Sequence, residues 1–89
     1  MEARASEMII TLRNSLGREL MTYRSYVVPR AKEHISVSIG SDSMRWKVMG
    51  VEYQVRGEQG DTVDLEVLPV NDAARDHASS LSIVTESIR

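Results

Sequence analysis

Apolar and polar residues alternate along most of the first 70 positions, and this pattern predicts a chain built mainly from β-strands. In residues 34–40 isoleucine and valine alternate with serine, so one face of that strand would be buried and the other exposed. In residues 62–70 valine and leucine alternate with acidic residues until Pro69, which has no N–H to donate to a sheet. Asparagine and glycine within residues 14–17 favour a tight turn. The five predicted strands cover residues 7–13, 18–28, 34–40, 43–55 and 62–70.

One of these strands changes phase in its middle. Three apolar residues share one face of its first half, and three apolar residues of its second half would share the opposite face. One extra residue at or beside Met49 and Gly50 restores the pattern, as in a β-bulge, where glycine would supply backbone freedom. We therefore predict a bulge at a barrel corner; two short strands joined by a loop at Gly50 are the alternative. The two triplets are Met44, Trp46 and Val48, and Val51, Tyr53 and Val55.

Residues 71–89 change from the strand pattern to a helical one. Asn71 or Asp72 can cap a helix, and Asp76 lies in its early turns, where a negative charge favours the helix dipole. The stripe of apolar residues is too narrow to hold a lone helix, so we expect it to pack on the barrel or at a homo-oligomer interface. A final strand through residues 81–85 is the alternative. The stripe comprises Ala74, Ala78, Leu81, Val84 and Ile88, at spacings of three and four.

The composition indicates one small domain with an aliphatic core. The chain has 89 residues, of which 42% are hydrophobic, and this is ordinary for a globular protein. There is no phenylalanine and one tryptophan, so we predict that Trp46 is buried as the principal aromatic residue of the core. The expected fold is mainly β: residues 1–70 form a five-stranded small barrel or strongly bent antiparallel sheet, and residues 71–89 form a C-terminal helix.

The net charge of −2 hides two parts of opposite sign. Residues 1–56 contain nine Lys or Arg against six acids, whereas residues 57–89 contain two against seven. A basic body and an acidic tail favour a basic binding surface, or contact between the two parts within or between protomers. The sequence has no cysteine, no apolar run that could span a bilayer and no signal-peptide pattern. We expect a cytoplasmic protein that does not bind membranes.

Residue types that carry catalysis or bind metals are sparse. His34 and His77 are the only histidines, no cysteine accompanies them, and no serine lies in a nucleophile-elbow context. The sequence GEQGD at 57–61 lacks the Lys-Ser/Thr pair of a nucleotide-binding loop. We therefore expect no enzyme activity, no metal and no cofactor.

The most suggestive residues for function are basic and aromatic. Lysine and arginine beside an exposed aromatic ring can hold phosphates while the ring stacks on a base. Trp46 lies among these residues in the sequence, but it belongs to an apolar triplet and is assigned to the core. The candidate binding residues are Tyr23, Arg24, Tyr26, Arg30, Lys32, Arg45, Lys47 and Tyr53.

Three segments follow one another between residues 27 and 70: VVPRAKEHISVSI, MRWKVMGVEYQV and DTVDLEVLPV. This order resembles a pattern in small uncharacterised bacterial and phage proteins, where a Pro-Arg-x-Gly-Glu turn leads into a short strand, an aromatic-x-Val strand and a Val-x-Leu-x-Val strand. The resemblance implies a small barrel like that of Src-homology-3 domains and implies no activity. Lys32 stands where that pattern has glycine, so we expect the turn to differ.

These observations favour a small non-enzymatic binding module, and the resemblance suggests a phage accessory protein. Proteins of that class commonly occupy a host factor or sequester a nucleotide, so the expected partner is a host protein or a small anionic, nucleotide-like ligand. The alternative is a small nucleic-acid-binding barrel that uses the Tyr/Arg surface. A small enzyme whose site is completed in an oligomer comes last. We also expect a homo-oligomer.

Overall fold

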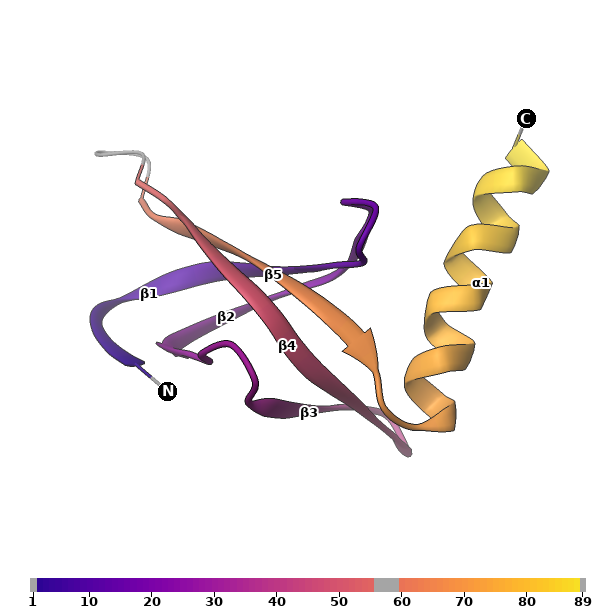
Figure 1. The fold of residues 1–89 in the computed structure, drawn as a ribbon, viewed down its shortest axis with the longest axis horizontal. Helices are drawn as coiled ribbons and strands as arrows, with labels where there is room; N and C mark the ends of the chain where they lie inside the picture. Colours follow the sequence, from indigo (N-terminus) through magenta and orange to yellow (C-terminus); the bar gives the residue numbers. More distant parts are fainter. Residues whose placement is uncertain (1, 56–59, 89) are drawn as a thin grey trace.

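The structure is a computed structural model, and it describes the backbone of residues 2–55 and 60–88 and the side chains of residues 6–55 and 60–80. Five strands are followed by one helix, as the alternation predicts, and the chain is mainly β (Figure 1). The elements are β1 (Glu2–Arg13), β2 (Glu19–Val28), β3 (His34–Ile39), β4 (Asp42–Gln54), β5 (Thr62–Pro69) and α1 (Asp72–Ile88).

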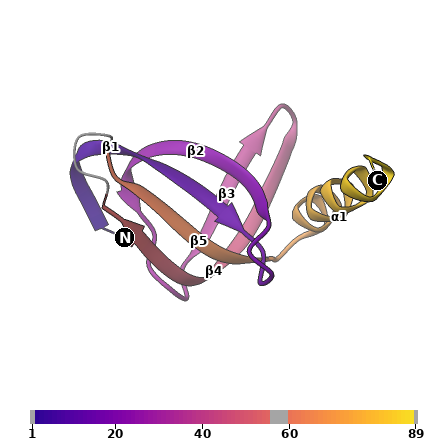
Figure 2. The ribbon, with the colours of Figure 1, turned by 90° about the horizontal axis from the view of Figure 1, so that it is seen from above.

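The strands form one strongly curled sheet in the order β2-β1-β5-β4-β3, so β2 and β3 are its edges. Figure 2 shows that the sheet is an open half-barrel with α1 at one end. The predicted bent sheet is confirmed, but it is not wholly antiparallel, because β1 pairs with β5 in parallel. The reason is that β2, β3 and β4 carry the chain around before β5 returns beside β1, and alternation does not reveal strand direction.

The phase change in β4 is a β-bulge, as predicted. Val48 lies opposite Val67 and Gly50 lies opposite Glu66, so Met49 is the additional residue. Because β4 is one continuous strand, the alternative of two short strands is wrong. The reason given for the glycine is also wrong. Gly50 does not have the left-handed φ that favours glycine, and a Cβ added there would meet no heavy atom within 4 Å.

The bulge places both apolar triplets on the concave face, but they are not equally buried. The first triplet is fully buried, and Val51 packs partly against the core. Tyr53 is 37% exposed and Val55 is 79% exposed, because Val55 lies beyond Gln54, the last β4 residue paired with β5. The second triplet therefore leaves the core towards the end of the strand.

The core fills the concave face of the sheet, and Trp46 is its largest fully buried side chain, as predicted. Alternate residues of β1, β4 and β5 supply most of the other side chains, which confirms the inward faces predicted for β4 and β5. The buried hydrophobic residues are Met8, Ile10, Leu12, Leu20, Val28, Ile35, Met44, Trp46, Val48, Val63, Leu65, Val67 and Ala74.

Asn71 fixes the start of α1 against β4. Its Oδ1 accepts the backbone N–H of Ala74 at 3.0 Å, which is the hydrogen bond of a helix N-cap. The same Oδ1 accepts the N–H of Arg45 at 3.2 Å, and Nδ2 donates to the carbonyl of Ser43 at 2.8 Å. One side chain therefore caps the helix and joins it to the sheet.

The helix packs on the half-barrel over the part whose side chains are described. Ala74 is fully buried and Ala78 packs against the core. His77 forms a hydrogen bond through Nε2 with the carbonyl of Leu20 at 2.9 Å, and its ring meets that of Trp46 edge to face at 6.4 Å. The predicted helix is confirmed and the alternative strand is wrong. The side chains of Leu81, Val84 and Ile88 lie outside the described residues.

The turn between β2 and β3 places Lys32 in a backbone conformation suited to glycine, with a φ of 77°. The turn is held by backbone hydrogen bonds to β4, from Lys32 N–H to the Val48 carbonyl at 2.7 Å and from Val48 N–H to the Glu33 carbonyl at 2.8 Å. The Arg30 N–H donates to Glu33 Oε1 at 2.6 Å, and this hydrogen bond lowers the pKa of the Glu33 carboxyl.

We expect Lys32→Gly to raise the free energy of unfolding by up to about 1 kcal/mol. A left-handed φ costs a non-glycine residue about 1–2 kcal/mol, and glycine loses about 0.5–1 kcal/mol of backbone entropy in return. Lys32→Val should lower the free energy of unfolding, because a β-branched side chain tolerates this φ least. Urea denaturation of both variants measures the difference. Shifts of the same sign would show that this φ is not strained.

Candidate functional site

The eight predicted binding residues do not form a single surface. Three lie on β2, two in the turn that follows it, and three on β4. Alternation within the strands then separates neighbours in the sequence, because successive side chains point to opposite faces. The structure therefore divides the predicted surface into parts that must be considered separately.

Tyr23 faces the concave side of β2, opposite Ile10 of β1, and packs partly against the core. Burial raises the pKa of its phenol, so the hydroxyl remains neutral at ordinary pH. Arg24 and Tyr26 lie on the other face of β2 and are exposed. The Arg24 guanidinium lies 3.9 Å from a Glu7 carboxylate oxygen. The two tyrosines of β2 therefore cannot stack bases along one groove.

A cavity of about 420 Å³ lies between the two edge strands of the half-barrel. We call it the edge cavity. Side chains from the concave face of β2 meet those of β3 across it, and β2 and β3 are not hydrogen-bonded neighbours in the sheet. The residues that line it are Tyr23, Ser25, Val27, Pro29, His34, Ile35, Ser36, Val37 and Ser38.

The chemistry of the edge cavity suits an extended peptide. Val27, Ile35 and Val37 supply apolar surface, and Ser25, opposite Met8 on the concave face, adds a hydroxyl that accepts the Val27 N–H at 3.0 Å. Ser36 and Ser38 lie on the other face of β3, opposite Arg45 and Ser43, and border the cavity from the strand edge. Each bordering strand is a sheet edge, and an edge presents backbone N–H and C=O groups that the sheet itself does not pair. A segment in the β conformation can use both the backbone groups and the side-chain pockets.

Basic residues lie at one end of the edge cavity. Pro29 and His34 line the cavity, and the turn between them carries Arg30 and Lys32, both exposed. Within the described residues, neither of these two side chains forms an ion pair. The Glu33 carboxylate is turned back onto the Arg30 N–H. This end of the cavity is therefore suited to a negative charge.

The predicted residues of β4 lie elsewhere. Arg45 and Lys47 are on the outer, convex face, where they pair with Ser36 and His34 of β3. Tyr53 is on the concave face near the far end of β4, opposite Val63. None of the three lines the edge cavity. The lining residues that sequence reasoning missed, chiefly Ser25, Val27 and Val37, show the ordinary alternation of a strand.

The described residues show neither a metal-binding cluster nor a membrane-spanning helix. They hold no group of three or more His, Cys, Asp or Glu side chains that could bind a metal ion. No helix in the described part of the chain is long and apolar enough to cross a membrane.

Comparisons with protein-family models, with curated proteins and with solved structures found no match. The resemblance to Src-homology-3-like barrels therefore stays a prediction from the sequence. The candidate site is defined by its geometry: two free sheet edges border one cavity, and basic residues lie at one end of it.

Proposed function

We propose that this protein is a non-enzymatic binding module that takes an extended, acidic segment of a partner protein into the edge cavity. The observation that carries the proposal is that both free edges of the half-barrel line one cavity. A peptide strand added to a sheet edge gains main-chain hydrogen bonds, and alternate side chains reach the pockets on one side. The apolar and hydroxyl lining suits a segment in which apolar and polar residues alternate.

The acidic character of the segment follows from the basic end of the cavity. Arg30 and Lys32 belong to the turn between Pro29 and His34, both of which line the cavity, so a strand that leaves the cavity at this end would pass near them. Complementary charge of this kind directs binding and selects the partner more than it adds affinity. Glutamates or aspartates at one end of the segment would therefore fix its direction.

Two other expectations fit the geometry less well. The described residues that line the edge cavity include no lysine or arginine, so they offer little to the phosphates of a nucleotide-like ligand. Binding of single-stranded nucleic acid needs aromatic rings along one basic groove, and Tyr23 and Tyr26 lie on opposite faces of β2. A cytoplasmic location and a phage origin stay predictions from the sequence.

The proposal is tested by fluorescence anisotropy with a labelled peptide in which valine alternates with threonine and glutamates fill one end. The protein should bind this peptide more tightly than a matched peptide with lysines in place of the glutamates. The double variant Arg30→Glu/Lys32→Glu should weaken binding of the acidic peptide by about tenfold, which is about 1.4 kcal/mol. Val37→Trp, at a half-buried position on the concave face that lines the cavity, should block it.

The matched control is Arg45→Glu/Lys47→Glu, which reverses two basic residues on the other face and should leave peptide binding unchanged. Melting temperatures establish that each variant is folded. Equal binding of both peptides, or unchanged binding in the first double variant and in Val37→Trp, would overturn the proposal. Salt-sensitive binding of an oligonucleotide without binding of either peptide would instead support the nucleic-acid alternative.

A further inference from the structure

The convex face of β4 and β5 carries opposite charges at its two ends. Arg45 and Lys47 point outward from the first half of β4. Beyond the bulge, Glu52 of β4 lies opposite Asp64 of β5, and Glu66 lies opposite Gly50. One stretch of two paired strands therefore changes from basic to acidic along its length.

Exposed apolar side chains lie between the two charged ends. Leu68 is directly opposite Lys47 and is 43% exposed. Met49 is the additional residue of the bulge and is 44% exposed. Met49 and Leu68 lie where the face changes from basic to acidic, so they form its apolar centre. An apolar centre with a polar rim is the usual arrangement of a protein interface.

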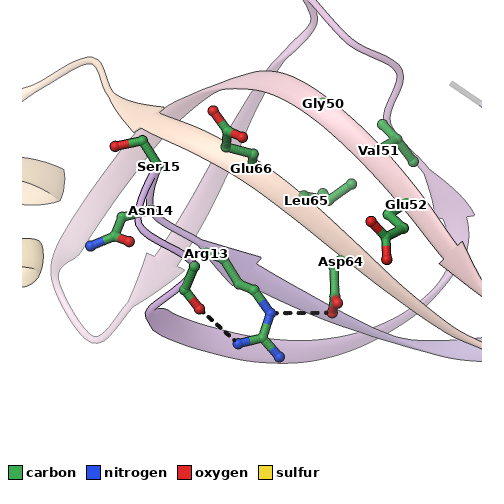
Figure 3. Close-up of a pocket in the computed structure, with 10 residues that line it drawn as sticks. Arg13, Asn14, Ser15, Gly50, Val51, Glu52, Asp64, Leu65 and Glu66 are labelled. Atoms are coloured by element: carbon green, nitrogen blue, oxygen red, sulfur yellow. Dashed lines mark hydrogen bonds and ion pairs between the residues drawn. The ribbon is translucent and has the colours of Figure 1, made fainter.

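A second cavity, of about 360 Å³, opens at the acidic end beside the bulge (Figure 3). Gly50 contributes no side chain to it, while Glu52, Asp64 and Glu66 place three carboxylates around it. Among the described residues that line it, Arg13 supplies the one cation, with Nε 3.5 Å from Asp64 Oδ1 and Nη1 donating to the Gly17 carbonyl at 3.1 Å. The cavity therefore keeps a net negative charge.

In the described part of the chain, the charged residues at the two ends of the convex face have few ion-pair partners. Glu66 is exposed, and in the described part of the chain it forms no ion pair. Arg45 is exposed and Lys47 is half-buried, and neither forms an ion pair with a described residue. Glu52 accepts a hydrogen bond from the Gln54 amide at 3.2 Å, which leaves its charge uncompensated. Both ends of the convex face can therefore pair with groups from another molecule.

We propose that a second copy of this chain docks on the convex face in a two-fold symmetric dimer. An isologous interface uses the same patch on both subunits, so the patch must complement itself. With β4 of the two copies antiparallel, Arg45 and Lys47 of each copy face the acidic cavity of the other, and the Met49 and Leu68 side chains meet at the axis. Exposed ion pairs add little, about 0–1 kcal/mol each, so the apolar centre stabilises the dimer and the charges fix its register.

The test is the mass in solution, measured by sedimentation equilibrium over a range of protein concentrations. The wild type should approach twice the 10.0 kDa of one chain. The variants Arg45→Glu/Lys47→Glu and Glu52→Lys/Glu66→Lys should each weaken dimerisation by more than about tenfold, because like charges then face each other across the axis. An equimolar mixture of the two variants should recover the dimer, since every repulsive contact becomes attractive in the heterodimer. Leu68→Ser should weaken the dimer without any change of charge.

A wild type that stays monomeric, a dimer that survives both double variants, or a mixture that fails to recover it would each overturn the dimer. Melting temperatures near that of the wild type establish that the variants fold. The edge cavity is lined by residues of β2, of β3 and of Pro29 between them, and none of the described residues that line it belongs to β4 or β5. The dimer and the peptide complex can therefore fail independently, with mass reporting one and peptide anisotropy the other.

Discussion

Replacement of Trp46 by alanine is expected to lower the free energy of unfolding by about 3–5 kcal/mol, the range for a large aromatic residue in a packed core. Trp46 is fully buried, and it is the one tryptophan in a chain without phenylalanine. Its ring also meets that of His77, so it links the sheet to α1. Urea denaturation followed by far-ultraviolet circular dichroism measures the loss.

The matched variant is Trp46→Phe, which should lose only a fraction of that free energy. Phenylalanine keeps an aromatic ring in the core, and it removes an indole N–H that is buried without a hydrogen-bond partner among the described residues. A buried donor without a partner costs about 1–3 kcal/mol, so its removal offsets part of the lost volume. Equal losses in the two variants would show that the indole nitrogen contributes to the core. Unchanged stability in Trp46→Ala would mean that the residue is not structural.

The strands could be predicted because alternation is a local property of the sequence. The bulge is the clearest case: Val48 and Val51 are separated by three positions, and only one extra residue lets both side chains face the core. The helix was predictable for the same kind of reason, since Ala74 and Ala78 lie one turn apart and Asn71 can cap. Each of these inferences needs only neighbouring residues.

The candidate site could not be predicted, because it depends on which strands are edges. Val37 and Val48 each belong to three apolar residues that alternate along a strand, yet Val48 is fully buried and Val37 lines the edge cavity. The difference arises from the strand order, in which β5 inserts beside β1 and leaves β2 and β3 unpaired on one side. The predicted Tyr/Arg residues are divided between faces for a related reason: Tyr23 and Arg24 are adjacent in sequence but point to opposite faces of β2.

The helix provides the second large effect. Ala74→Asp should lower the free energy of unfolding by about 3 kcal/mol or more at neutral pH, because a buried carboxylate without a partner costs several kcal/mol. Ala74 lies in the first turn of α1, where an acidic residue favours an isolated helix, so the loss must come from burial against the sheet. Denaturant unfolding at a series of pH values measures it.

The dependence on pH distinguishes burial from a general weakening of the helix. Burial raises the pKa of the introduced carboxyl above its unfolded value, so the folded state binds the proton more tightly than the unfolded state. The destabilisation should therefore shrink as the pH falls towards about 4, where the carboxyl becomes protonated and neutral. Ser79→Asp places the same charge at an exposed position of α1 and should change stability by no more than about 0.5 kcal/mol. If both variants behaved alike, α1 would not be docked on the half-barrel through Ala74.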